Sequence, residues 1–264
     1  MLLGMLFVLA VAGGPPHHDI TVVATDYAFA MPDTVAAGET TFRIVNRGHE
    51  MHHLYLARLA RGKTAADLVA AFKTGGPPPA WATDAGGPNG VDPGATSLAA
   101  TVPLAPGHYA ALCIIPGPDG VPHIMKGMYK DLIVTATTQP ASFARSGPRT
   151  TITLADYSFQ TSARLTAGVH RVLVRNVGKQ SHELELARLL PGKTPADLAA
   201  WADKMAGPPP AHFVGGVSLL AAGGENELTL DLAPGHYVML CFVPDAKDGK
   251  PHVAHGMVRD FVVE

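Results

Sequence analysis

The strongest constraint on this chain is an internal repeat that covers most of its 264 residues. The segment LARL at 56–59, followed by GKT at 62–64, returns 130 positions later at 186–189 and 192–194. The segment APGHY at 105–109 returns 128 positions later at 233–237. Solenoids and propellers repeat every 20–50 residues or so, whereas one long offset that drifts by two residues indicates two copies of a single domain.

The repeat predicts two domains, at residues 20–136 and 150–264. Between them, residues 137–149 are rich in Ser, Thr, Gln, Pro and Gly, which is typical of a linker. Two arrangements are compatible with this pattern: the domains close against each other, or they hang on the linker as separate units.

The first residues predict export from the cytoplasm. Residues 2–12 form an apolar run, and small residues precede Gly13 as they do at a signal-peptide cleavage site. The run is shorter than the roughly 20 residues of a membrane-spanning helix. We therefore predict a signal peptide at 1–12, a periplasmic or extracellular location, and no membrane span in the mature chain. No Lys or Arg precedes Arg43, so either the true start lies upstream or the signal is atypical, and an uncleaved N-terminal anchor is the alternative to a cleaved signal.

The composition restricts the class of protein. Hydrophobic residues make up 47% of the chain, which is enough for packed cores and argues against disorder. Charged residues make up only 16% and the net charge is −2, so the chain has no excess of basic residues with which to bind nucleic acid. The 28 Gly and 23 Pro separate short apolar runs, and this pattern of short strands joined by many turns predicts an all-β fold.

Alternating apolar and polar residues predict half-buried strands in each copy. The strands with this alternation are 41–45 and 53–57 in the first copy and 171–175 and 183–187 in the second. Further strands are expected at 97–102, 132–134, 227–232 and 261–263, and turns at Pro106-Gly107 and Pro234-Gly235 are expected to lead into strands that end at Cys113 and Cys241. One short helix interrupts each copy, because Thr64 and Thr194 resemble N-caps that precede an acidic residue in the first turn. The apolar runs that follow, at 68–72 and 198–205, suit amphipathic helices.

Four residues with metal-binding side chains recur in the same order in both copies. They are His52, Cys113, His123 and Met128 in the first copy, and His182, Cys241, His252 and Met257 in the second. Two imidazoles, one thiolate and a distant thioether form the ligand set of a type 1 copper site. A disulfide between the two cysteines is the alternative interpretation, but equivalent strand ends of separate domains make it improbable.

The repeat selects the ligand where several residues compete. His49, His52 and His53 cluster in the first copy, but the second copy has only His182, which aligns with His52. His49 and His53 are therefore interpreted as exposed residues or as neighbours of the ligands. Met125 has no counterpart in the second copy, which leaves Met128 as the axial candidate.

Each copy resembles the cupredoxin family. The resemblance rests on Asn46-x-Gly48 before His52, on Pro-Gly-x-Tyr-x₃-Cys ending at Cys113, and on His123-x₄-Met128, with the same pieces in the second copy. It implies two tandem Greek-key β-sandwiches, each with one short helix insertion and one type 1 copper ion. Nine and ten residues separate Cys from the second His, more than the two to four of the family's small electron carriers, and this longer loop is more similar to the type 1 site of copper nitrite reductases.

One departure from the nitrite reductases bears on catalysis. Those enzymes place a His directly before the Cys to pass electrons to a second kind of copper centre, whereas Leu112 and Leu240 occupy these positions here. We therefore expect a non-enzymatic copper protein that transfers single electrons to and from a redox partner protein in the cell envelope. The alternatives are a copper capture, storage or resistance module, and a metal-free interaction module.

Overall fold

The computed structural model describes residues 17–74, 78–137, 150–202 and 207–264. The predicted signal peptide and residues 138–149 of the predicted linker lie outside the described residues. Among the helices that are described, none is long and apolar enough to cross a membrane.

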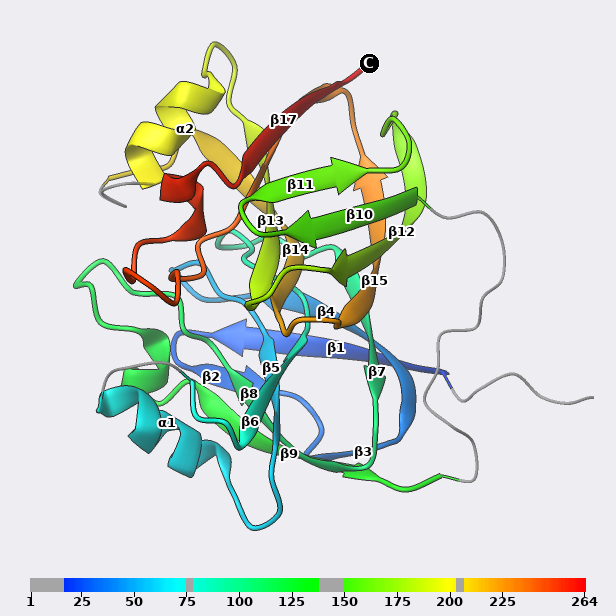
Figure 1. The fold of residues 1–264 in the computed structure, drawn as a ribbon, viewed down its shortest axis with the longest axis vertical. Coiled ribbons are helices and arrows are strands. Elements are labelled where there is room, and N and C mark those ends of the chain that lie inside the picture. The colour runs from blue at the N-terminus through cyan, green and yellow to red at the C-terminus, as the bar shows by residue number, and fades with distance from the viewer. Residues whose placement is uncertain (1–16, 75–77, 138–149, 203–206) are drawn as a thin grey trace, which may run out of the picture.

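The two halves contain nearly the same elements in the same order (Figure 1). The first half comprises β1 (His17–Thr25), β2 (Ala28–Ala30), β3 (Thr34–Ala36), β4 (Gly38–Asn46), β5 (Tyr55–Leu59), α1 (Ala65–Lys73), β6 (Ala82–Gly86), β7 (Ala99–Leu104), β8 (Gly107–Leu112), the 3₁₀ helix η1 (His123–Lys126) and β9 (Tyr129–Thr135). The second half comprises β10 (Thr150–Ala155), β11 (Ser158–Thr161), β12 (Gly168–Asn176), β13 (His182–Leu189), α2 (Pro195–Ala202), β14 (Ala211–Leu220), β15 (Glu225–Leu232), β16 (Gly235–Leu240), the 3₁₀ helix η2 (His252–His255) and β17 (Val258–Val263).

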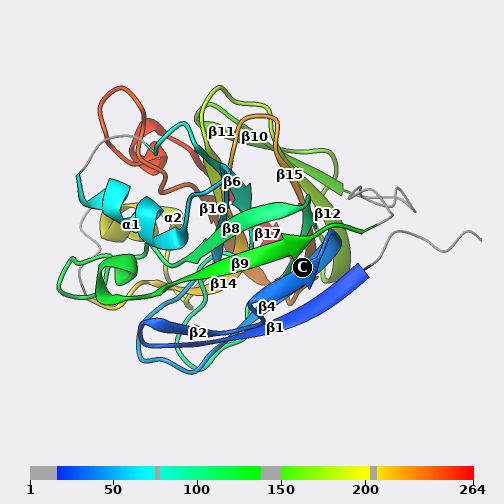
Figure 2. The ribbon, with the colours of Figure 1, turned by 90° about the horizontal axis from the view of Figure 1, so that it is seen from below.

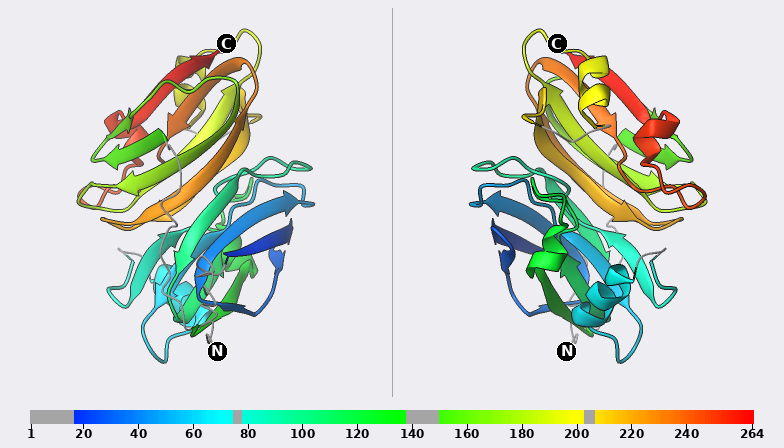
Figure 3. Two further views of the ribbon diagram at one scale, coloured as in Figure 1. Left: turned by 90° about the vertical axis from the view of Figure 1, so that its right-hand side faces the viewer. Right: turned by 90° about the vertical axis from the view of Figure 1, so that its left-hand side faces the viewer.

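Two sheets run through the described part of the molecule, and each crosses from one half into the other. One sheet has the order β11-β10-β12-β15-β7-β4-β1-β2, and the other has the order β17-β16-β13-β14-β6-β5-β8-β9-β3. Within each half the two sheets face each other as a β-sandwich, seen edge-on in Figure 3. The predicted all-β tandem fold is confirmed.

The halves are joined by strand pairing as well as by side-chain packing. Ala100 of β7 lies opposite Leu228 of β15, and these two residues occupy equivalent positions of the repeat, 128 apart. In the other sheet, Leu220 of β14 pairs with Ala85 of β6. The two domains therefore close against each other, and the arrangement of separate units is excluded.

The helices follow from local capping. In α1, Thr64 is the N-cap, and its side chain and that of Asp67 accept hydrogen bonds from each other's backbone amides. Thr194 and Asp197 repeat these bonds at α2, which begins at Pro195, directly after the predicted N-cap Thr194. Residues 203–206 lie outside the described residues. Both helices lie on the same side of the molecule (Figure 2).

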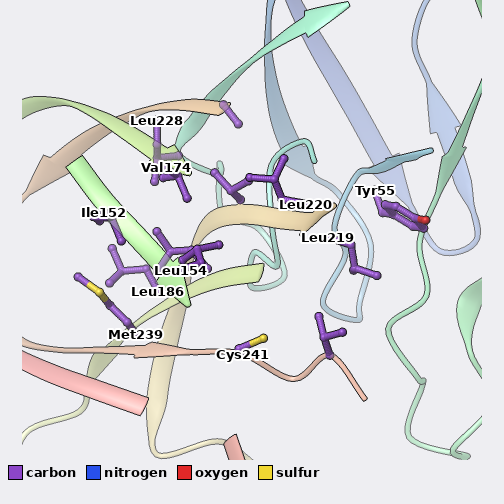
Figure 4. Close-up of a cluster of buried hydrophobic side chains, with 14 of the residues drawn as sticks. Tyr55, Ile152, Leu154, Val174, Leu186, Leu219, Leu220, Leu228, Met239 and Cys241 are labelled. Atoms are coloured by element: carbon purple, nitrogen blue, oxygen red, sulfur yellow. The ribbon is translucent and has the colours of Figure 1, made fainter. Parts of the chain in front are cut away.

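Alternation of apolar side chains fills the cores. In β4, Phe42 and Ile44 are fully buried in a cluster that also holds Cys113 and Met128. A second cluster extends across both halves, and its second-half members include Leu154, Leu186, Met239 and Cys241 (Figure 4). The two cysteines are thus placed in the apolar interiors of opposite halves.

Candidate metal centres

Strand pairing assembles the first centre. His52 precedes β5, Cys113 follows β8, and Met128 precedes β9. Because β8 pairs with both β5 and β9, the ends of these three strands meet at one place. The amide of Cys113 donates a hydrogen bond to the carbonyl of Met128 at 3.1 Å, and His123 reaches the same place from η1.

In the first centre, three ligand atoms converge. The Nδ1 atoms of His52 and His123 lie 3.2 Å apart, and Cys113 Sγ lies 3.4 Å from His123 Nδ1. All three atoms lie within 4.8 Å of one another. One metal ion between them would contact two imidazole nitrogens and one sulfur.

The second centre repeats this geometry. The Nδ1 atoms of His182 and His252 lie 3.0 Å apart, and Cys241 Sγ lies 3.3 Å from the Nδ1 of His252 and 4.0 Å from that of His182. Met257 is fully buried in the same cluster as Cys241, as Met128 is beside Cys113. The structure therefore brings the two His and the Cys of each predicted group together and buries the Met of each group in the same cluster as the Cys.

Both centres are closed to solvent. The four histidines and both cysteines of these groups have no exposed surface. Burial raises the pKa of Cys113 to about 12 and also raises the pKa of Cys241, so each thiol is protonated when no metal is bound. A metal ion that binds here must displace this proton. Both cysteines are free, which excludes the disulfide.

Carboxylates select the tautomer of three ligand histidines. The Nε2 atom of His52 lies 3.1 Å from Asp26, that of His123 lies 2.7 Å from Glu50, and that of His182 lies 2.9 Å from Asp156. An ionised carboxylate can only accept, so each Nε2 carries the proton and each Nδ1 carries a lone pair.

These tautomers provide a test of whether a metal fits. In the first centre, the lone pairs of His52 and His123 face each other across 3.2 Å and repel unless a cation lies between them. Burial lowers the pKa of each imidazole more than its carboxylate neighbour raises it, so a shared proton is disfavoured. The donor set of two neutral imidazoles, one thiol and a buried thioether fits copper.

No protein-family model matches the sequence, and no curated protein matches it. Among solved structures, auracyanin from Roseiflexus castenholzii is similar at 24% identity, with 45% of this chain and 99% of that chain covered and a TM-score of 0.32. Auracyanin A from Chloroflexus aurantiacus, a "blue" copper protein, is 20% identical over 46% of this chain and 100% of its own, with a TM-score of 0.33.

A longer match covers both halves. The Cu-containing nitrite reductase from Thermus scotoductus is 13% identical over 94% of this chain and 61% of its own, with a TM-score of 0.25. The fold is assigned from this chain's own strand order and from its two buried His-Cys-His-Met groups. Both halves are cupredoxin-like.

The two cupredoxin-like halves differ around the second histidine. Gln180 occupies the repeat position of Glu50, so His252 has no counterpart of the His123–Glu50 bond. Asp245 stands 3.8 Å from His252 Nε2, held by Tyr157 and Gln180. That nitrogen is buried and has no hydrogen-bond partner among the described residues.

A tyrosine covers each centre. The ring of Tyr27 meets His123 edge-on with centroids 5.3 Å apart, and Tyr157 meets His252 at 5.4 Å. Sequence reasoning assigned no role to these residues or to the acidic residues before them. A signal was present, because Asp26 and Tyr27 return 130 positions later as Asp156 and Tyr157.

The competing histidines of the first half fall into the two predicted categories. His49 is exposed, and its Nδ1 lies 2.7 Å from Asp26, the carboxylate that also holds His52. His53 is buried, with its Nδ1 3.2 Å from Asn89 Oδ1 and its Nε2 accepting a hydrogen bond from the Ile114 amide. Neither belongs to the first centre.

Proposed function

We propose that this protein holds one type 1 copper ion in each half and transfers single electrons between protein partners. The observation that carries the proposal is the convergence of two imidazole nitrogens and one cysteine sulfur within 4.8 Å of one another, twice in one chain. Copper bound there would supply reversible one-electron chemistry, because this donor set accommodates both Cu(I) and Cu(II).

The residues of the chain determine how such an ion is held. His52, Cys113 and His123 would supply the three strong bonds of the first centre, and His182, Cys241 and His252 those of the second. Met128 and Met257, buried in the same clusters as the cysteines, would supply thioether donors that tune the potential. The carboxylates of Asp26, Glu50 and Asp156 orient the rings and keep their second nitrogen protonated.

Burial favours electron transfer over metal delivery. An electron can tunnel through a layer of protein, whereas a copper ion that is captured and released must pass through an opening. The ligands of both centres have no exposed surface, so the sites are better suited to retaining an ion than to exchanging it. Capture and storage is therefore the less favoured function.

We further propose that the protein is a carrier and not an enzyme. Leu112 and Leu240 precede the two cysteines, so neither thiolate is joined through a neighbouring His to a catalytic copper centre. The apolar run at 2–12 supports a location in the cell envelope, where the partner would be another redox protein. Cell fractionation of the full-length protein tests this location, and recovery in the cytoplasm would contradict it.

The function is tested by loading the full chain with Cu(II) and measuring copper per chain together with the visible and EPR spectra. We expect two copper ions per chain, an intense thiolate-to-copper band and a narrow hyperfine splitting. A colourless protein that retains no copper would leave the metal-free interaction module as the explanation. Rapid loss of copper to a weak chelator would favour capture and storage.

A further inference from the structure

Three buried polar residues lie between the two centres. His53 follows the ligand His52, Glu183 follows the ligand His182, and His53 and Glu183 occupy equivalent positions of the repeat. Asn89 lies between them, and the three side chains are exposed by only 2%, 5% and 1%, for His53, Glu183 and Asn89 respectively. Polar groups this deeply buried are retained where they are hydrogen-bonded.

Hydrogen bonds through these three residues form a continuous path between the two centres. On the side of the first centre, this path begins next to Cys113, the cysteine of that centre. Ile114 follows Cys113, and its amide donates to Nε2 of His53 at 3.0 Å. The opposite nitrogen, His53 Nδ1, lies 3.2 Å from Asn89 Oδ1. Because Nε2 accepts a hydrogen bond, the ring proton is on Nδ1, which donates to Asn89.

On the side of the second centre, the path continues without a break. The Nδ2 atom of Asn89 donates to Glu183 Oε2 at 3.2 Å. The other oxygen, Glu183 Oε1, accepts from the amide of Phe242 at 2.7 Å, and Phe242 follows Cys241. Each of the four hydrogen bonds has one donor and one acceptor, so the orientation of every group in the path is fixed by its neighbours.

The path joins the same position of both centres. In each half, the residue after the first histidine ligand accepts a hydrogen bond from the amide after the cysteine ligand: His53 from Ile114, and Glu183 from Phe242. Asn89 connects these two local contacts across the boundary between the halves. Electronic coupling decays more slowly through covalent and hydrogen bonds than through an unbonded gap.

We propose that the hydrogen-bonded bridge His53–Asn89–Glu183 carries electrons between the two metal centres, so that an electron delivered to either half is shared by both. The step is an internal exchange, in which the copper of one half goes from Cu(I) to Cu(II) and that of the other half from Cu(II) to Cu(I). No proton and no further reactant take part. This inference rests on the proposed copper function and adds a route between the two sites.

The repeat provides a matched control residue. Ser218 occupies the position equivalent to Asn89, 129 residues later, and is also fully buried between the halves. Its hydroxyl donates a hydrogen bond to the carbonyl of Leu54 at 3.1 Å, and this bond is not one of the four that form the path. Ser218→Ala therefore disturbs the same boundary without cutting the bridge.

The experiment uses the full chain with copper in both sites and follows the exchange directly. Met257→Gln changes the axial donor of the second centre only, which separates its absorption band from that of the first. In this background, a one-electron pulse from a radiolytically generated reductant is given, and the two thiolate-to-copper bands are recorded. We expect a redistribution between the bands whose rate does not depend on protein concentration.

The bridge variants are Asn89→Leu, which removes both links, and Asn89→Asp, which retains an acceptor for His53 but removes the donor to Glu183. We expect each to slow the redistribution by at least about tenfold while Ser218→Ala leaves it nearly unchanged. Thermal unfolding of the metal-free variants, and the positions of both bands, show whether the fold and the two centres are intact.

The possible outcomes distinguish a failure of the proposed bridge from a failure of the proposed copper function. If the protein shows no thiolate-to-copper bands, the copper function itself is wrong. If both bands are present but the redistribution is bimolecular, or is as fast in both Asn89 variants as in the parent, the bridge does not carry the electron. A rate that falls equally in the Asn89 variants and in Ser218→Ala would assign the effect to loosening of the boundary, which also overturns the bridge.

Discussion

Asp26 orients the imidazole of His52 by accepting a hydrogen bond from Nε2 at 3.1 Å, which leaves Nδ1 free for a metal ion. We expect Asp26→Asn to weaken copper binding at the first centre by about 10- to 100-fold, because the amide can hold the ring in the wrong tautomer. Copper affinity measured by competition with a chelator, and read at the band of each centre, gives this value.

The second centre supplies the comparison for this prediction. Asp156→Asn should weaken the second centre and leave the first unchanged, because Asp156 contacts only His182 among the ligands. Equal loss at both centres from either substitution would show that the carboxylates act on the fold as a whole and not on their own imidazole.

Each cysteine belongs to one centre, so the two can be removed one at a time. Cys113→Ala is expected to lower the copper content from two ions per chain to one and to remove one thiolate-to-copper band, because Cys241 and its histidines form a separate group. Cys241→Ala is the mirror-image variant. Loss of both bands from either substitution would contradict independent sites, and copper analysis with visible spectroscopy decides the matter.

Gly48 lies where the ligand histidine and its carboxylate meet. A Cβ at this position would clash with Asp26 Oδ1 and would lie 2.6 Å from His52 Nε2. We expect Gly48→Ala to lower the free energy of unfolding of the metal-free protein by about 1–3 kcal/mol, since backbone or ring must move to make room. Urea denaturation measures this, and an unchanged midpoint would show that the loop adjusts freely.

Among individual residues, those that follow the repeat could be predicted and those that break it could not. His52 was selected over His49 and His53 because only His52 has a counterpart, and the structure places it in the centre. Asp245 could not be found, because it approaches His252 from a different loop from the one that carries Gln180, the counterpart of Glu50.

At the level of elements, α1 tests how far local capping stabilises the fold. Thr64→Ala removes a side chain that accepts from the Asp67 amide, and we expect a loss of about 1 kcal/mol in the free energy of unfolding. Both copper bands should keep their positions, because Thr64 contacts neither centre. Thr194→Ala should behave alike at α2, and urea denaturation with visible spectra checks both.

The strands that could be predicted are those with clear alternation. The segments at 41–45 and 171–175 are found within β4 and β12. By contrast, β14 was not predicted, because Gly215 and Gly216 interrupt it and both have positive φ angles. These glycines lie where Leu184 and Ser97–Leu98 approach most closely, a requirement set by the neighbouring strands and invisible in the segment itself.

At the level of the whole molecule, both sheets are continuous across the two halves. We therefore expect the metal-free protein to unfold in a single cooperative transition, because separating the halves would break the β7–β15 and β14–β6 pairs and expose Asn89 and Glu183. Scanning calorimetry tests this, and two resolved transitions would show that each half is stable alone. The sequence could not predict whether the two domains pair, because the residues of an edge strand do not determine which other strand pairs with it.

The pairing of Ala100 with Leu228 has a consequence for how such a chain could arise. Contact between equivalent positions is what two identical domains make around a twofold axis. A single-copy ancestor with this strand edge would therefore dimerise through it, and duplication with fusion of its gene would convert that dimer into one chain. After the fusion, each half could accumulate its own substitutions. His53 and Glu183 occupy the same position of the repeat but are different residues, and two identical subunits cannot differ in this way.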